Sequence, residues 1–467
     1  MPKSLVRFST TFLLIACNGN TTNEEDSRGG PAVQHNVTEN GIVDQLRDLS
    51  DGTLEVLPAS GTSEWLELRV GGERVFLPRS SRTPDVSTYH FGRGDVQHPT
   101  STTNVGFELS GLSGWQQGDG LQIVSPNVGL TMVGPENGFA VYPSAGSTTI
   151  SGQALDWKTA FAPIIDGAKG DTTWVTQMAA ANLHYSRLTR AGLASGFTIT
   201  DGRPGKLSAT LAPVAQDRTL ALHWKGTAFA ALASEAGPAA QPAPAPAISI
   251  RALPDALARN NDFFHSFYTN LPSLVDFGPI SGSADLDEAV TYGNPFSSMG
   301  AKWTELATVV YALPVSIQTP QGNGMVPAMM VSAIPVSALA DKGVIAPSIT
   351  PVRNAKIDGQ PLDAPRSGVG SSPTLSWEAP AIGTPTSYAV VVHEVEGSKL
   401  GVSVKKAATF YTKSTSLRIP DSVAKQGGSY VFTITAIASP GADLTTRPFV
   451  GALSYASADH VTARQTL

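Results

Sequence analysis

Residues 429–438 have the sequence SYVFTITAIA, in which Tyr430, Phe432, Ile434 and Ala436 recur at every second position. A period of two places these four side chains on one face of a β-strand. Working outward, further short strands are predicted within 373–380, 387–395, 416–420 and 449–463. About seven such strands in about 110 residues are typical of a β-sandwich. The pattern therefore predicts a β-sandwich over residues 346–467.

The same residues resemble a fibronectin type III domain. Residues 373–377, PTLSW, are similar to that family's second strand with its buried tryptophan, and residues 430–436, YVFTITA, are similar to its sixth strand. A compact Leu-x-Pro-Gly turn usually precedes the tyrosine in the family, whereas here a longer loop contains Gly427 and Gly428. The resemblance implies that Trp377 and Tyr430 lie in the core of a spacer or binding module.

Composition extends the all-β prediction to the whole chain. The 467 residues include 45 Gly and 34 Pro, and only 15% are charged, against about 25% in an average domain. Frequent turn residues among Val, Ile, Thr and Leu favour many short strands. Residues 65–70 and 73–77 flank Gly71-Gly72 and predict a hairpin. Residues 174–193 fit both periods, and the neighbouring strands favour β-structure there.

The sequence divides into several predicted segments. One β-sandwich is expected over residues 41–235, followed by an Ala/Pro-rich linker or loop over 236–246. Residues 247–345 form either a second β domain or the continuation of the first. The fibronectin-like module over 346–467 completes the chain, so the predicted fold class is an all-β, multidomain protein.

The N-terminus carries an export pattern. Lys3 and Arg7 precede a short, mostly apolar stretch, and Ala16-Cys17 is followed by a polar segment. Residues 14–17, LIAC, resemble the lipobox of bacterial lipoproteins. The resemblance implies removal of residues 1–16, acylation of the Cys17 thiol and of the new amino group, and, with Asn18 next, transfer to an outer membrane. Residues 17–40 are poor in large apolar side chains and predict a flexible tether.

Charge and cysteine content exclude several functions. The net charge is −6 with no long basic run, so a nucleic acid is not an expected partner. Cys17 is the only cysteine, which excludes an intrachain disulfide and cysteine-based catalysis. The chain contains no G-x-S-x-G, H-E-x-x-H, phosphate loop or dinucleotide loop. No catalytic residue, metal ligand or cofactor is therefore assigned, and Cys17 is the one predicted modification site.

Other residues of the chain are weaker candidates for metal binding or recognition. His90, Asp95 and His98, with Asp85 upstream, match no metal-ligand spacing and are interpreted as loop residues. The tripeptide Arg93-Gly94-Asp95 resembles an integrin-recognition motif, but so short a motif arises easily by chance.

Acidic, imidazole and indole side chains gave three more candidates. Asp285, Asp287 and Glu288 are interpreted as a solvated acidic turn. Hydrogen-bonded packing is expected for the three histidines that lie beside aromatic residues, His184, His223 and His265. Most tryptophans are expected in cores, whereas Trp115 in its polar, glycine-rich setting is predicted at a loop tip.

These observations favour a binding or scaffold protein of the bacterial cell envelope without catalytic activity. The membrane is the expected partner through the acyl chains on Cys17, and an envelope protein or a glycan is the expected ligand class. The alternative is an envelope hydrolase that acts on polysaccharide or peptidoglycan through loop carboxylates. That alternative requires two carboxyl groups about 5–10 Å apart in a cleft. A purely structural role requires neither a cleft nor an exposed aromatic patch.

Overall fold

The computed structural model describes residues 33–38, 41–48, 54–58, 64–70, 73–81, 84, 93, 95–134, 143–160, 162–238, 240–242, 245–253, 257–259, 271–278, 280–299, 303–339, 343–398 and 401–467. Strands dominate these residues, and helices are short: α1 (Gly226–Ala230), α2 (Ala233–Ala236) and the 3-10 turns η1 (Pro126–Val128), η2 (Gly167–Lys169), η3 (Pro295–Met299) and η4 (Val336–Ala338). The all-β, multidomain prediction is confirmed. In the part of the chain that the structure describes, no helix is long and apolar enough to span a membrane.

Most of the N-terminal predictions concern residues that the structure does not describe. The signal and Cys17 lie outside the described residues. Strand β1 (Val33–Thr38) lies within the predicted tether, where it pairs with β2 (Gly41–Asp48). Within residues 33–38 of the predicted tether the β-formers Val33 and Val37 lie in this strand.

A first β-sandwich encloses a core of its own. One layer consists of β12 (Gly205–Thr210), β6 (Asn104–Ser110) and β9 (Thr149–Asp156), and the other of β8 (Leu130–Gly134), β7 (Gly120–Ser125), β10 (Trp174–Ala180) and β11 (Tyr185–Leu193), with β13 (Ala212–Pro213) beside β11. An apolar cluster includes Phe107 of β6, Ile123 of β7 and Val175 of β10, together with Trp157 directly after β9. The hairpin of β10 and β11 confirms the strand prediction for residues 174–193.

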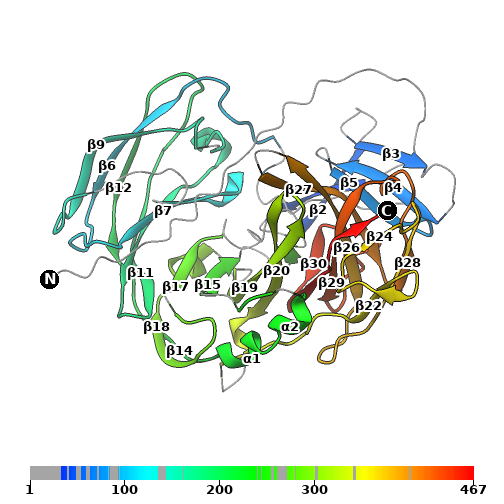
Figure 1. Ribbon diagram of the computed structural model, residues 1–467. Coiled ribbons are helices and arrows are strands. Elements are labelled where there is room, and N and C mark those ends of the chain that lie inside the picture. Colours follow the sequence, from blue (N-terminus) through cyan, green and yellow to red (C-terminus); the bar gives the residue numbers. More distant parts are fainter. Residues whose placement is uncertain are drawn as a thin grey trace.

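Hydrogen-bonded strands continue from this sandwich to the C-terminal part of the molecule (Figure 1). Beyond β11 the order is β17 (Ser273–Phe277), β15 (Ala247–Leu253), β19 (Thr304–Thr319), β20 (Gly322–Pro335), β31 (Tyr455–Val461), β29 (Ser429–Ala438), β26 (Ser387–Ser398) and β27 (Gly401–Thr412). Within this order, the pairings of β11 with β17 and of β20 with β31 cross the predicted segment boundaries. The linker segment also runs beside this sheet, since Ala240 bridges to Val315.

Smaller sheets complete the middle of the chain. Strand β14 (Arg218–Lys225) lies between β18 (Asp285–Tyr292) and β21 (Val344–Ile345), and β16 (Leu257–Arg259) pairs with β30 (Val450–Ala452). The inner face of β14 carries Trp224, which stacks on Phe229 of α1 at 4.6 Å between ring centroids. This packing fixes α1 against the central sheet.

The C-terminal residues form a second sandwich. One layer is β23 (Gln360–Pro361), β22 (Arg353–Ile357), β25 (Thr374–Glu378) and β28 (Ser416–Arg418); the other is β27, β26, β29 and β31, with β24 (Arg366–Ser367) and β32 (Gln465–Thr466) at the end of β29. Trp377 lies edge-on to Tyr388 at 5.4 Å between these layers. Tyr430 is buried and its hydroxyl accepts a hydrogen bond from the Lys425 N–H at 2.9 Å. The predicted core positions of Trp377 and Tyr430 are confirmed.

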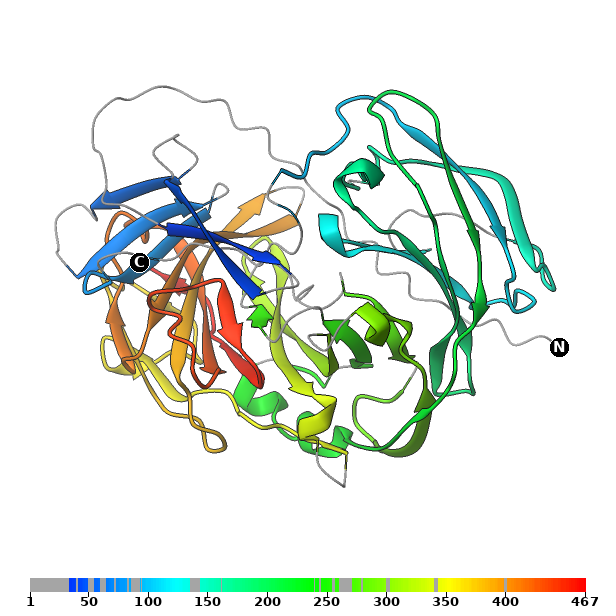
Figure 2. The same cartoon turned by 180° about the vertical axis from the view of Figure 1, so that it is seen from behind.

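Strands from the start of the chain extend the C-terminal sheet. The predicted hairpin around Gly71-Gly72 is confirmed as β4 (Trp65–Val70) and β5 (Glu73–Pro78), with β3 (Leu54–Pro58) beside β4. Strand β5 pairs in parallel with β27 through Val75 and Phe76. Figure 2 shows these N-terminal strands beside the C-terminal strands. The face of the C-terminal sheet that points away from the sandwich core carries a further apolar cluster, with Leu68 and Val75 from these strands and Tyr411 and Tyr455 from the sheet.

Candidate functional site

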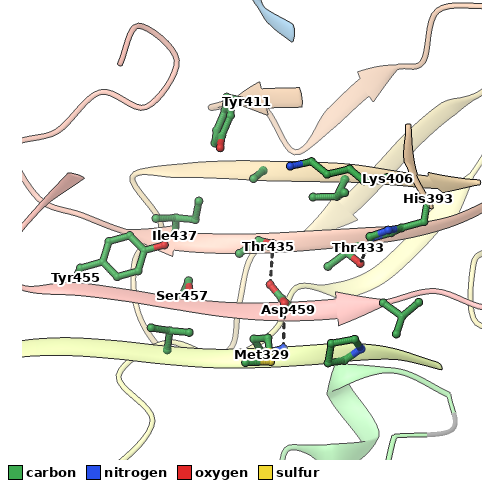
Figure 3. Close-up of a pocket in the computed structure, with 15 residues that line it drawn as sticks. Met329, His393, Lys406, Tyr411, Thr433, Thr435, Ile437, Tyr455, Ser457 and Asp459 are labelled. Atoms are coloured by element: carbon green, nitrogen blue, oxygen red, sulfur yellow. Dashed lines mark hydrogen bonds between the residues drawn. The ribbon is translucent and has the colours of Figure 1, made fainter. Parts of the chain in front are cut away.

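A recess of about 130 Å³ lies on that second face of the C-terminal sheet. Strands β20, β31, β29, β26 and β27 all contribute to it (Figure 3). Its lining is made of Val326, Pro327, Met329, Val331, Ala389, Val391, His393, Lys406, Tyr411, Thr433, Thr435, Ile437, Tyr455, Ser457 and Asp459. The recess therefore joins residues that are far apart in the chain.

Side-chain size explains why the sheet surface is hollow here. Asp459, Thr435, Ala389 and Tyr411 are cross-strand neighbours and form one row over four adjacent strands. The middle members of this row are small, and Ser457 on β31 is small as well. Larger side chains such as Met329 and Tyr411 stand at either side. Because neighbouring side chains on one face are about 5 Å apart, a patch of small residues between large ones leaves a hollow.

The lining of the recess contains a buried carboxylate that accepts hydrogen bonds from a hydroxyl and from a backbone N–H. Asp459 is 7% exposed. Its Oδ1 accepts a hydrogen bond from the Thr435 hydroxyl at 2.7 Å, and its Oδ2 accepts one from the Met329 N–H at 2.9 Å. Figure 3 shows both bonds. Such bonds offset the cost of removing a carboxylate from water.

Two basic side chains, His393 and Lys406, also line the recess. The His393 Nε2 and the Thr433 hydroxyl oxygen are 3.0 Å apart. The Lys406 Nζ donates to the Glu73 carboxylate of β5 at 2.6 Å. The N-terminal strands thus contribute a counter-charge to a side chain that lines the recess.

The groups that line the recess can be compared with those that two kinds of catalysis require. A hydroxyl beside an imidazole is one requirement of nucleophilic catalysis, and Thr433 with His393 meets it. A second requirement is a set of donors aimed at the developing oxyanion. The strands β26, β29 and β31 are each paired on both sides, so their ladder N–H groups bond neighbouring strands. Asp459 is the one carboxylate among the lining residues, whereas glycoside hydrolysis uses two.

The residues weighed as weak metal-ligand candidates are not brought together in the described part of the chain. His90 and Asp85 lie outside the described residues, and His98 is exposed. Asp95 pairs with Lys169 and Arg93. Within the described ranges no group of three His, Cys, Asp or Glu side chains is placed to hold a metal ion.

The contacts of Arg93 also bear on the Arg93-Gly94-Asp95 tripeptide. Its guanidinium donates to both oxygens of the buried Asp171 carboxylate, at 3.0 and 3.1 Å. A fork of this kind holds the side chain in one geometry. Arg93 is therefore committed to its own sandwich, and it is not presented for recognition by another protein.

We expect Asp95 to titrate at unusually low pH. Its bonds to Lys169 and Arg93 lower the pKa of this carboxyl from 3.8 to about 2. Because the folded state favours the charged form, the contribution of these pairs to stability is present above pH 4 and is lost as the pH falls toward 2. Carbon-13 NMR of the Asp95 carboxyl checks this, and Lys169→Ala is expected to raise the pKa. A wild-type midpoint near 3.8 would contradict the expectation.

The three carboxylates of β18 are all engaged by neighbours. The Asp285 carboxylate accepts from the Thr227 hydroxyl at 2.7 Å, and from Lys225. The Asp287 carboxylate lies 2.6 Å from the His223 Nδ1, and the Glu288 carboxylate lies 2.5 Å from the His184 Nδ1. Hydrogen bonding of His184 and His223 is confirmed, and His265 lies outside the described residues. None of these carboxylates lines the recess.

The loop-tip prediction for Trp115 is wrong. Trp115 is 8% exposed and belongs to the core of the first sandwich. Its backbone pairs with Ser147 and Gly146, which draws the glycine-rich segment inward. Polar neighbours such as Gln116 and Asp119 make a local turn, and this turn explains the misleading sequence pattern.

Sequence reasoning missed every residue of the recess. A signal was available in residues 429–438, because Thr433, Thr435 and Ile437 alternate with the inward-facing residues. An exposed face of a two-layer sandwich usually carries charged side chains. Uncharged residues on both faces indicate that the second face is covered as well.

Comparisons with known proteins identify no family. Neither a protein-family model nor a curated protein matches the chain. Solved structures of alpha-2-macroglobulin from Salmonella, reacted with methylamine, and from E. coli, in its native conformation, align with 87% and 90% of this chain. The identities are 11% and 9% and the TM-scores 0.15 and 0.14. The chain spans about a quarter of their length, 26% and 27%, and likenesses this weak carry no argument about function.

Proposed function

We propose that this protein is a lipid-anchored binding protein of the bacterial cell envelope, and that it holds its ligand in the recess without catalysing a reaction. The observation that carries the proposal is the recess itself: a row of small side chains, with a buried Asp459 whose oxygens already accept hydrogen bonds. A rigid, largely preformed hollow with few polar groups is typical of binding sites.

The proposal favours binding over the hydrolase alternative for a structural reason. A hydrolase of polysaccharide requires a second carboxyl opposite the first. Asp285, Asp287 and Glu288 are paired on β18 with Thr227, His223 and His184. None of them faces Asp459 across the recess.

The fibronectin type III assignment of residues 346–467 is part of the proposal. It is supported by the two layers, β22, β25 and β28 against β27, β26, β29 and β31, and by the positions of Trp377 and Tyr430. The bond between the Tyr430 hydroxyl and the Lys425 N–H supports a tyrosine corner despite the longer preceding loop. In this module the binding surface is the outer face of the β27–β26–β29–β31 layer.

The anchor is proposed from the sequence pattern around Cys17. Two or three acyl chains, at about 0.8 kcal/mol per buried CH₂, hold a protein stably on a membrane. We expect Cys17→Ser to abolish incorporation of radiolabelled palmitate and to move the protein from the membrane fraction to the soluble fraction. Retention of the label in this variant, or an unprocessed wild-type protein in the cytosol, would contradict the anchor and the outer-membrane location.

Filling the recess tests the binding site directly. Ala389 points into the hollow and is 4% exposed, so Ala389→Leu places a branched side chain where the ligand would sit. We expect retention of the protein on immobilised envelope material to fall by at least about tenfold, which corresponds to 1.4 kcal/mol.

Ala381→Leu is the matched control, since Ala381 is exposed on a loop away from the recess. Equal retention of the wild type and of Ala389→Leu, with both folded by circular dichroism, would reject the recess as the binding site.

A further inference from the structure

We propose that the protein self-associates by strand exchange, in which strands β3, β4 and β5 of one copy dock on the C-terminal sheet of a second copy. This inference goes beyond the proposed binding function and does not depend on it. It rests on how these N-terminal strands are held, on the chemistry of the sheet edge that receives them, and on the length of chain that follows them.

The N-terminal strands are packed on both faces against residues of the C-terminal sheet. On one face Trp65 and Phe76 contact Phe410, at 5.2 and 4.4 Å between ring centroids. On the other face Val75 belongs to the apolar cluster that contains Tyr411. A hairpin such as β4–β5 is marginally stable in water on its own. The stability of these strands therefore depends on a C-terminal sheet on which to dock.

The edge of β27 receives β5 in the manner of strand addition. Val75 pairs with Thr409 and Phe76 with Phe410, and the successive side chains Val75 and Phe76 belong to clusters on opposite faces of the sheet. In strand addition, backbone pairing supplies affinity and the contacts of alternate side chains supply specificity. None of these contacts depends on the covalent connection between the strands, so a second copy can supply the same strand.

Polar contacts at this edge specify the sequence of the added strand. The Lys406 Nζ donates to the Glu73 carboxylate at 2.6 Å, where the two side chains are 20% and 25% exposed. The Arg74 guanidinium donates to the Ser422 carbonyl at 3.0 Å. A partner strand must therefore carry an acidic and then a basic residue before its apolar residues, as residues 73–76, ERVF, do. A second copy of this chain supplies that order, and it is the partner that we name.

The chain that follows β5 is long enough to reach a neighbouring copy. The Ser81 hydroxyl donates to the Thr445 carbonyl at 2.6 Å, and the Arg93 N–H donates to the Asn127 carbonyl of the first sandwich. An extended chain covers about 3.3–3.6 Å per residue, so residues 82–92 can span up to about 40 Å. Exchange keeps every contact of the docked strands and changes only the copy that supplies them, which makes it a low-cost route to dimers.

Charge reversal distinguishes exchange from docking within one chain. In Glu73→Lys, and equally in Lys406→Glu, the pair within one chain becomes a pair of like charges. An exchanged dimer of the two variants restores an opposite pair at both edges, because the strands of each copy meet the sheet of the other. The full-length variants, one of them isotope-labelled, are refolded together from urea and examined by native mass spectrometry. We expect at least about tenfold more mixed dimer than the dimer that either variant forms alone.

The double variant Glu73→Lys, Lys406→Glu is the matched control, because it restores the opposite pair within one chain. Mixed with labelled wild type, it should give no excess of mixed dimer, since exchange between these two proteins creates like pairs. A mixture of the two single variants that forms no more dimer than this control, with both variants folded by circular dichroism, would overturn the inference.

A disulfide provides a second test that does not alter the ion pair. Val75→Cys and Thr409→Cys, which are register partners, are placed in separate copies in a Cys17→Ser background and mixed under oxidising conditions. We expect a disulfide-linked mixed dimer whose yield rises with protein concentration. Thr374→Cys replaces Thr409→Cys in the control, because Thr374 is exposed on β25. A yield no higher than that of the control would contradict the exchange, even if the charge-reversal variants fail to fold.

Discussion

Phe410→Ala is expected to destabilise the C-terminal half of the molecule by about 3–5 kcal/mol, the usual cost of removing a buried phenylalanine ring. Phe410 is fully buried on β27. Its ring stacks on Phe76 at 4.4 Å between centroids and meets Trp65 edge-on at 5.2 Å. The substitution would therefore leave a cavity at the junction where the N-terminal strands join the C-terminal sheet.

This junction has little other support along the backbone, since β5 and β27 are paired only through Val75 with Thr409 and Phe76 with Phe410. We expect hydrogen–deuterium exchange to accelerate in residues 65–78 of Phe410→Ala before it accelerates in the first sandwich. Phe410→Leu, which keeps most of the volume, is the control and should lose much less stability. An unfolding midpoint in urea that is unchanged in Phe410→Ala would show that the N-terminal strands do not depend on this contact.

Arg93→Met is expected to cost a similar amount, about 3–5 kcal/mol, for an electrostatic reason. The Asp171 side chain is fully buried and receives two hydrogen bonds from the guanidinium of Arg93. Removal of one partner leaves an uncompensated buried charge, which is more costly than the loss of a surface pair. The effect should appear as a lower urea midpoint for residues 95–215, followed by tryptophan fluorescence.

Two control variants distinguish the stability lost by leaving Asp171 unpaired from the stability lost by removing any cation. Lys405→Met breaks an exposed pair with Glu396 and should cost at most about 1 kcal/mol. Adding Asp171→Leu to Arg93→Met should restore part of the lost stability, because it removes the stranded carboxylate. A double variant that is less stable than Arg93→Met alone would refute the explanation.

The sequence predicted the local elements well where a period of two was strong. The alternation of Tyr430, Phe432 and Ile434 located β29, and the Gly71-Gly72 dipeptide located the hairpin of β4 and β5. Period and turn chemistry are local properties, so they can be recognised in a short window of sequence.

Long-range pairing could not be predicted in the same way. The parallel contact of Phe76 with Phe410 joins strands more than three hundred residues apart, and neither strand carries a local signal for its partner. The recess depends on this register, because Thr435 lies beside Asp459 and Ala389 only when β31, β29 and β26 are aligned. The misplacement of Trp115 has the same origin, since backbone pairing to Ser147 and Gly146 draws it into the core.

The histidine and carboxylate pairs of β18 show what composition can and cannot predict. The sequence indicated that His184 and His223 make hydrogen bonds in packed structure, and they bond Glu288 and Asp287. It could not show that Asp459, one acidic residue in a strand near the C-terminus, is the carboxylate placed in a hollow. A buried position is recognised only once the neighbouring strands are known.

Hydrogen–deuterium exchange of the full-length protein, with and without solubilised envelope material, tests the central claim most directly. The account predicts slower exchange in residues 433–437 and 455–459 when that material is present, and no such protection in Ala389→Leu. Protection confined to residues 285–288, or protection of 433–437 that persists in Ala389→Leu, would show that the recess is not the binding site.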